Sequence, residues 1–430
     1  MRRDVAVTVG VRALLVGSGL VASVVTAHYL GSRGRGEYFV VVTLVAGIVQ
    51  FGNLGLQGSQ TYQVARDESL SRAVVANTLW ISLLVGIVGG GLAVAVLGLA
   101  HALPNVPTSR LWLAAAIAPS ALFFLLGTNV LVGLRRIRTF NVLEAVGHGL
   151  VLILLLGAGM LAFGVSGFLA ASALAWALAS SLLLFVLVRI AGWRSRFDWG
   201  VFRDGFRYAA KTYVIAGLGF LVLRSNVFLL TRIKGTTDVG YFSVAAQIAD
   251  ALAILPTSAA LVLFPSLVRD RTTRFASSLR ACAATMGLLV VATVVVGLLV
   301  EPLLGLLYPP RFAAAAPMLR WMLPGVVAAG GAAVLSQYLA AIGLPRTLVA
   351  VWGLALASVV TLGAILIPSH GGSGAGASLS ITYVAVLALV LVLALGHRRR
   401  ERAMPADATM KDAEPAAPPD PAWPALDRSE

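Results

Sequence analysis

A few charged side chains stand inside long apolar stretches, where they could do chemistry. Asp250 lies near the middle of one such stretch. An unpaired carboxylate there is costly, so it should pair with a cation or bind a proton. Glu144 and His148 are four residues apart, would share one helical face, and could relay protons. The alternatives are a purely structural ion pair at Asp250 and plain hydration of Glu144 near a helix end.

Cations and amides also occur within apolar stretches. Arg12 and Arg224 lie inside them, and such residues either face the interior of a helix bundle or extend to the membrane surface. Four amide side chains recur at spacings of three, four and three residues: Gln50, Asn53, Gln57 and Gln60. On one helix they would share a face. That face could bind a polar ligand or hold neighbouring helices together.

Composition places the chain among integral membrane proteins. Of its 430 residues, 59% are hydrophobic and 12% are charged, and the mean hydropathy is +0.90. No soluble core absorbs that much apolar surface. The single cysteine, Cys282, excludes an intramolecular disulfide and a cysteine-based metal site. The net charge of +15 should therefore set membrane topology rather than bind nucleic acid.

Apolar windows of about 20 residues predict an all-α membrane protein with twelve transmembrane helices. The predicted helices lie near residues 7–30, 38–64, 74–99, 111–133, 141–163, 168–189, 208–231, 240–264, 280–304, 317–342, 347–368 and 377–396. These predict an N-terminal lobe (1–195), a basic cytoplasmic connector (196–207), a C-terminal lobe (208–396) and a tail (397–430). The tail begins with basic residues and continues with a Pro- and Ala-rich segment that we expect to be disordered.

Basic residues alternate between the predicted connections. One set holds most of the arginines, while the other holds only Arg33, Arg35, Arg110, Arg232, Lys234 and Arg311. Because cytoplasmic loops carry the excess of positive charge, both termini are predicted to lie in the cytoplasm.

The chain also contains an internal repeat. Gly31 and Gly36 bracket a polar segment before Tyr38-Phe39, and Gly235 and Gly240 bracket TTDV before Tyr241-Phe242. The copies end on Arg66-Asp67 and Arg269-Asp270, with Glu37 as the one extra residue. We interpret each copy as a helical hairpin with a tight glycine turn. Two halves in the same orientation should be related by a pseudo-twofold axis along the membrane normal.

Four segments resemble a known family: LGSRGRGEYF, FGNLGLQGS, RSNVFLLTRIKGTTDVGYFSVAAQIAD and GGSGAGAS. They are similar to segments of bacterial lipid-linked oligosaccharide flippases, the polysaccharide-export branch of the multidrug/oligosaccharidyl-lipid/polysaccharide exporter superfamily. The resemblance implies a V-shaped bundle of two six-helix lobes with a central cavity in the cytoplasmic membrane. By alternating access, the protein would move a polyprenyl-diphosphate-linked glycan outward for cell-surface polysaccharide synthesis.

The resemblance also assigns roles to residues. Arg12 and Arg224 would hold the diphosphate through their planar forks, and the amides would hydrogen-bond the sugar. Asn226 stands where such proteins often carry an acidic residue, and we include it in the substrate site. Coupling to an H⁺ or Na⁺ gradient would use Asp250, Glu144 and His148. We expect no bound cofactor and no metal site. The expected partners are membrane lipids and, from the same pathway, a polysaccharide polymerase and glycosyltransferases.

Two other functions remain open. A membrane-embedded glycan polymerase or ligase would be an enzyme and would need a sizeable external loop, whereas the longest predicted one spans only about residues 100–110. A cation-coupled drug exporter of the same superfamily would carry acidic residues in its cavity, whereas the first predicted helix offers Arg12.

Overall fold

The computed structural model describes residues 2–193, 196–256, 263, 267, 273–343 and 345–403, without the side chains of 2–9, 11–13, 207–212 and 400–403. All regular structure in this part of the chain is helical. The helices are α1 (Arg2–Gly52), α2 (Leu56–Arg66), α3 (Ser71–Leu84), α4 (Gly90–Leu99), α5 (Thr108–Gly133), α6 (Ile137–Met160), α7 (Gly164–Ala191), α8 (Trp199–Lys234), α9 (Thr236–Leu252), α11 (Arg274–Leu307), α12 (Ala315–Ala341) and α13 (Thr347–Ala403). A π-helical turn at Val85–Gly89 joins α3 to α4.

Within the described residues, ten helical segments are long and apolar enough to cross a membrane. This confirms a multi-pass membrane protein. The segments on α5, α9 and α12 are more than half buried, and the other seven are less than two-fifths buried. Helices α5, α9 and α12 therefore form the inside of the bundle, while the other segments present leucine- and valine-rich faces to the surrounding lipid.

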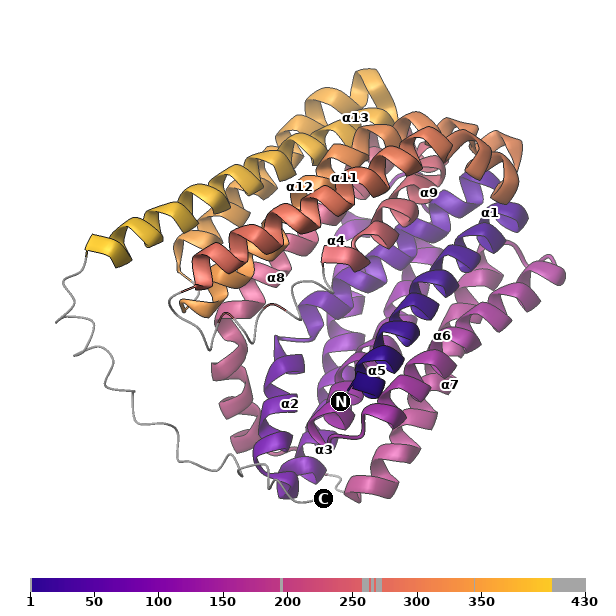
Figure 1. Cartoon of the computed structure of the whole chain (residues 1–430). Coiled ribbons are helices and arrows are strands. Elements are labelled where there is room, and N and C mark those ends of the chain that lie inside the picture. Colours follow the sequence, from indigo (N-terminus) through magenta and orange to yellow (C-terminus); the bar gives the residue numbers. More distant parts are fainter. Residues whose placement is uncertain are drawn as a thin grey trace.

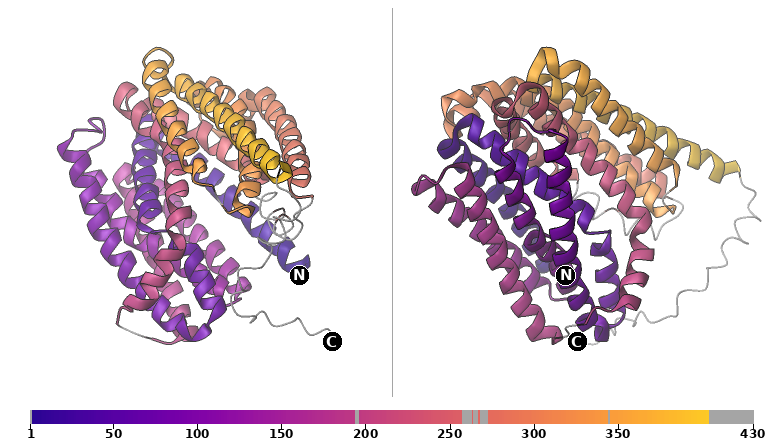
Figure 2. Two further views of the ribbon diagram at one scale, coloured as in Figure 1. Left: turned by 90° about the vertical axis from the view of Figure 1, so that its left-hand side faces the viewer. Right: turned by 180° about the vertical axis from the view of Figure 1, so that it is seen from behind.

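The helices fall into two groups that follow one another along the chain. Figure 1 shows α11, α12 and α13 on one side and α5, α6 and α7 on the other, and the two views of Figure 2 show the same division. The first group packs with α8 and α9, and the second packs with α1, α2 and α3. Helices α1 and α9 lie against each other where the groups meet. The two copies of the repeated motif therefore form the largest contact between the groups, and α8 adds a smaller one with α1, α2 and α3.

Two glycines at matching places in the repeat make the turns. Gly31 (φ 67°, ψ −177°) breaks α1, and Gly235 (φ 88°, ψ −179°) separates α8 from α9. A positive φ is unfavourable for other residues, and glycine allows the reversal. The predicted polar turns are too long, because a single residue turns the chain in each copy. Gly36 and Gly240 are helical.

Gly36 and Gly240 instead let the two copies touch. A Cβ atom on Gly36 would collide with the carbonyl of Thr236, and one on Gly240 would collide with the carbonyl of Ser32. The two contacts are reciprocal, because both pairs are offset by 204 residues (236 − 32 and 240 − 36). Backbones approach this closely in membranes only where side chains are absent or small. The second end of the repeat, Arg269-Asp270, lies outside the described residues.

Two predicted boundaries need correction. The predicted helix at 38–64 is interrupted by a turn at Asn53–Gly55, where Leu54 and Gly55 have positive φ. Helix α8 begins at Trp199, inside the predicted connector, because Asp198 caps it by accepting a hydrogen bond from the Val201 amide at 3.1 Å.

Candidate functional site

An ion pair joins α8 to α9 within the membrane-spanning segments. The Arg224 Nη2 donates to Asp250 Oδ2 at 2.7 Å. The side chains are 21% and 34% exposed, respectively. Asp250 therefore pairs with a cation, as one of its expected alternatives has it, and the cation is the residue that the resemblance assigns to the cargo. Among the described residues this is the one hydrogen-bond partner of the guanidinium, and because the group has five donors, most of the Arg224 fork is available.

The hairpin at Gly235 explains how the pair forms. Arg224 lies 11 residues before this glycine and Asp250 lies 15 residues after it. At 1.5 Å per residue, antiparallel helices bring such positions to similar depth. The sequence therefore encodes the pairing through one tight turn.

A cavity of about 240 Å³ adjoins the acidic member of the pair. Its lining is mostly apolar, with Asp250 and the Tyr383 ring on one side and Met322 and Trp352 among the other walls. The Asp250 carboxylate therefore lies between its cationic partner and open space. The cavity thus gives a ligand access to the ion pair.

The predicted face of four amides does not exist. The interruption of the helix puts Gln50 before it and Gln57 after it. Asn53 holds the turn itself: its Oδ1 accepts from the Gly55 amide at 2.7 Å, and its Nδ2 donates to the Gln50 carbonyl at 2.8 Å. The buried Gln60 donates to Thr78 Oγ1 at 2.9 Å. Asn53 therefore serves the local turn, where its side chain competes for the backbone. Gln60 joins α2 to α3, which is the alternative role expected for these amides.

Asn226 ties two helices together. It is fully buried, and its Nδ2 donates to the Ala375 carbonyl at 2.8 Å and to Ser378 Oγ at 3.0 Å. Both acceptors belong to α13. In this arrangement its amide group is an interhelical hydrogen-bond donor.

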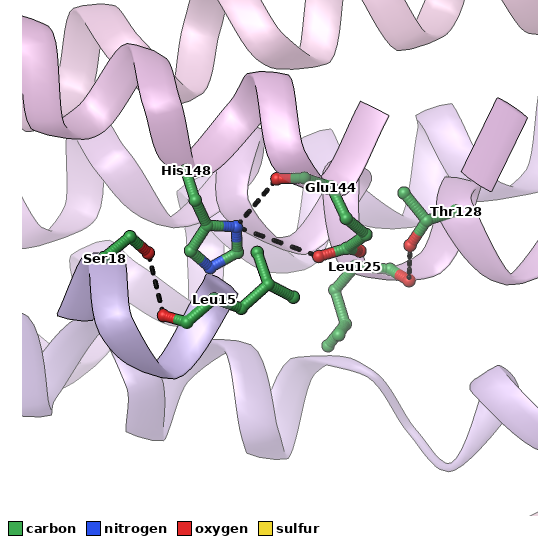
Figure 3. A network of polar contacts seen from close by, with 6 residues as sticks. All are labelled: Leu15, Ser18, Leu125, Thr128, Glu144 and His148. Carbon is green, nitrogen blue, oxygen red and sulfur yellow. Dashed lines mark hydrogen bonds and ion pairs between the residues drawn. The ribbon is translucent and has the colours of Figure 1, made fainter. Parts of the chain in front are cut away.

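Glu144 and His148 lie together on α6, as the spacing predicts. Their Oε2 and Nδ1 atoms are 3.8 Å apart, and the same nitrogen is 3.0 Å from the Glu144 carbonyl. Figure 3 shows the imidazole between Glu144 and the turn of α1 around Leu15 and Ser18. Among the contacts of the described residues, none joins this pair to Arg224 or Asp250. Arg12 lies one turn before Leu15 on α1, and its side chain lies outside the described residues.

Arg35 is a residue that sequence reasoning misses, because the charge pattern places it among the external loop residues. The structure shows it 3% exposed. Its Nε donates to Ser243 Oγ on α9 at 2.8 Å, and its Nη2 donates to Ser23 Oγ at 2.9 Å. Its Nη1 donates to the Ser23 carbonyl and to Thr26. Ser23 in turn bonds the Tyr308 hydroxyl at 2.7 Å. One guanidinium thus joins both parts of α1 to α9.

Glu37, the extra residue of the first copy, is also buried. It forms ion pairs with Arg110 at the start of α5 and, at 3.4 Å, with Arg33. These residues line a cavity of about 610 Å³ next to Pro104 and Asn105. The signal available in the sequence was the insertion itself, since an added charged residue in a repeated helix needs a partner.

Within the described residues, no group of three or more His, Cys, Asp or Glu side chains is placed to hold a metal ion. What the membrane-embedded part offers is a cation with spare donors, a carboxylate that can exchange its partner, and adjacent space. A guanidinium with spare donors beside open space can bind an anion.

Comparisons with known proteins identify the fold. No curated protein matches the chain. A lipid II flippase MurJ in an inward closed conformation shares 14% identity at a TM-score of 0.70, covering 89% of this chain and 86% of that one. A multidrug resistance MATE family transporter of the MOP superfamily, in its inward-facing conformation, shares 16% identity at a TM-score of 0.69, covering 94% and 96%. A mutant form of the Vibrio cholerae MATE transporter VcmN shares 14% identity at a TM-score of 0.63, covering 92% and 95%.

These likenesses establish a helical fold shared with transporters and flippases. The family model described as polysaccharide biosynthesis protein matches residues 1–270 of the 430. The match covers both copies of the repeat and the Arg224–Asp250 pair. The chain belongs to the polysaccharide biosynthesis protein family.

Proposed function

We propose that the protein is an alternating-access flippase. It moves a polyprenyl-diphosphate-linked oligosaccharide from the cytoplasmic to the outer leaflet for cell-surface polysaccharide synthesis. Family membership and a fold shared with a lipid II flippase support this assignment. The observation that carries it is the partly exposed Arg224–Asp250 pair within the membrane-spanning helices. A charged glycan cannot cross about 30 Å of hydrocarbon unaided, and a cation at this depth can accompany it.

The proposed architecture has twelve crossings in two six-helix lobes. Two of the ten apolar segments have 39 and 53 residues, each long enough to cross twice, and each is broken by a glycine of positive φ, Gly31 or Gly371. If each of these two segments crosses the membrane twice, the ten apolar segments make twelve crossings. The reciprocal contact of Gly36 and Gly240 supports a pseudo-twofold axis through the contact between α1 and α9. From the distribution of arginines, we propose that both termini lie in the cytoplasm.

The proposed cargo step is an exchange of partners at Arg224. With the cavity empty, Asp250 neutralises the guanidinium. An arriving diphosphate offers more acceptor oxygens in the same fork geometry and takes its place. The released carboxylate then faces an apolar cavity and binds a proton or Na⁺. Cargo binding and ion binding thereby become linked at one pair of residues.

The other predicted roles stay in the proposal without a direct contact to support them. Arg12, Gln50 and Gln57 are proposed to contact cargo from the opposite lobe. Glu144 and His148 are proposed as a second proton-binding pair, because α6 holds them against α1. The proposed partners are membrane lipids, a polysaccharide polymerase and glycosyltransferases of one pathway.

A cation-coupled drug exporter is the second candidate, favoured by the similarity to MATE transporters. A reconstitution experiment separates the two. Proteoliposomes would contain a synthetic polyprenyl-diphosphate disaccharide with a fluorescent sugar, and an impermeant reductant outside would report which leaflet holds it. A flippase equilibrates the lipid between leaflets, whereas protein-free liposomes retain an internal pool. If the protein expels a cationic dye and leaves the glycolipid in place, it is a drug exporter.

A further inference from the structure

The segment between α7 and α8 and the first turns of α8 expose aromatic rings. Phe197 is 37% exposed, Trp199 66% and Phe206 40%. These three rings form one layer through Phe202, whose ring centroid lies 5.6 Å from that of Phe197, 5.3 Å from that of Trp199 and 6.0 Å from that of Phe206. Trp199, Phe202 and Phe206 share a helical face because they are spaced by three and four residues. An apolar face of this size in water would be unfavourable.

Exposed arginines flank the aromatic layer. Arg189 lies in the last turn of α7, and Arg196 and Arg203 follow within the segment and the first turns of α8. Among the ion pairs of the described residues, none involves Arg189 or Arg196. Arg203 has only a 4.0 Å contact with Asp204. The guanidinium forks are therefore available to an external anion.

The segment is fixed to the ends of α2 and α3 by side chains that bond its backbone. Asn77 donates to the Asp198 carbonyl at 2.8 Å and accepts from the Asp198 amide at 2.7 Å. Gln63 donates to the Val201 carbonyl at 2.8 Å. Arg72 donates to the Ala191 carbonyl at 2.9 Å. The rings and arginines therefore form a preformed surface.

This surface continues directly from two membrane-spanning segments, Gly164–Ala191 and Tyr213–Lys234. It must therefore lie at the depth where hydrocarbon gives way to headgroups. Aromatic side chains concentrate at that depth, and arginine binds phosphate bidentately. Rings beside free guanidinium groups match the two parts of a phospholipid, its upper acyl chains and its phosphate.

We infer that residues 196–206 form a binding site for anionic phospholipid, with Arg196 and Arg203 holding the headgroup and the Trp199–Phe206 face lying among the upper acyl chains. The site rests on neither the proposed cargo nor the proposed orientation. It fixes the segment that links the two groups of helices to the membrane surface.

The test is native mass spectrometry of the full chain in detergent, titrated with phosphatidylglycerol or phosphatidylcholine. Phosphatidylglycerol should bind more tightly. Each arginine near an anionic surface contributes about fivefold in affinity. The double variant Arg196→Gln/Arg203→Gln should therefore weaken phosphatidylglycerol binding by about 25-fold and leave phosphatidylcholine binding unchanged.

The matched control is Arg136→Gln/Arg138→Gln, which removes the same charge from exposed positions immediately before α6 and in its first turn. Equal loss in the control would show that total charge, rather than this site, governs binding. Trp199→Ala tests the contact with the acyl chains separately from the headgroup, so it should weaken binding of both lipids. Equal affinity of the unaltered chain for the two lipids would overturn the proposal.

Discussion

Arg35 and Arg224 are both arginines inside apolar helices, and their surroundings are opposite. Arg35 is almost fully buried, and in the described part of the chain its bonds go to hydroxyl and carbonyl oxygens. Arg224 keeps 21% of its side chain exposed and has one carboxylate partner beside a cavity. Arg35 uses its fork on four fixed acceptors, whereas Arg224 uses one arm on a group that can be neutralised.

The two arginines show the difference between a charge that holds the fold together and a charge that can change its partner. A buried guanidinium whose donors are satisfied by the fold stabilises one arrangement of helices, and its removal leaves acceptors unpaired. A guanidinium with spare donors beside open space can change partner without disturbing the fold. We therefore expect substitutions where α1 meets α9 to lower stability and substitutions at the Arg224–Asp250 pair to impair transport.

The largest effect on folding is expected at the backbone contact between α1 and α9, next to Arg35. Gly36→Val and Gly240→Val place side chains against the carbonyls of Thr236 and Ser32, which cannot move without displacing a helix. Both variants should fail to fold, measured as loss of monodisperse protein in detergent. Gly149→Ala on α6 is the control, because its Cβ meets no atom within 4 Å. Normal folding of the two valine variants would show that α1 and α9 are not in this contact.

A smaller loss of stability is expected for Arg35→Ala. Removing four hydrogen bonds at about 0.6 kcal/mol each should lower the free energy of unfolding by about 2 kcal/mol. Lysine cannot reproduce the fork and should restore little of it. The measurement is thermal unfolding of purified protein. Arg224→Ala, measured in parallel, should change stability less, and the reverse order would contradict the distinction between the two arginines.

Asp250→Asn should give the smallest structural change. The amide keeps a hydrogen bond to Arg224 and removes the charge, so the protein should fold with unchanged thermal stability. Transport should lose the part of its pH dependence that comes from proton binding at Asp250, and the Glu144–His148 pair would account for the remainder. Flipping by proteoliposomes at pH 6 and pH 8 tests this. If the variant keeps the pH response of the unaltered chain, proton coupling resides elsewhere, and Glu144→Gln becomes the next variant to measure.

The sequence predicted those features that depend on local pattern. The length of the apolar stretches predicted the membrane-spanning helices, and the repeated glycines predicted the two turns at Gly31 and Gly235. The cost of an unpaired carboxylate predicted that Asp250 would find a cation. Spacing also placed Glu144 beside His148.

The features that the sequence did not predict depend on tertiary contacts, which no local pattern encodes. Arg35 and Glu37 look like turn residues because charged residues near glycines usually face water, and only the packing of α9 and α5 buries them. The four amides do not share one helical face because the turn at Asn53–Gly55, with Leu54 and Gly55 at positive φ, interrupts the helix between Gln50 and Gln57. Asn226 bonds α13, which lies about 150 residues later in the chain.

Export of cell-surface glycan by Arg224 variants tests the central claim most directly. If Arg224 exchanges Asp250 for a diphosphate, Arg224→Gln should abolish export, and Arg224→Lys should restore only part of it, because an ammonium keeps the charge without the fork. Expression and thermal stability are measured for each variant, and Arg320→Gln on the exposed surface of α12 is the matched control. Full export by Arg224→Gln in a stable protein would contradict the account.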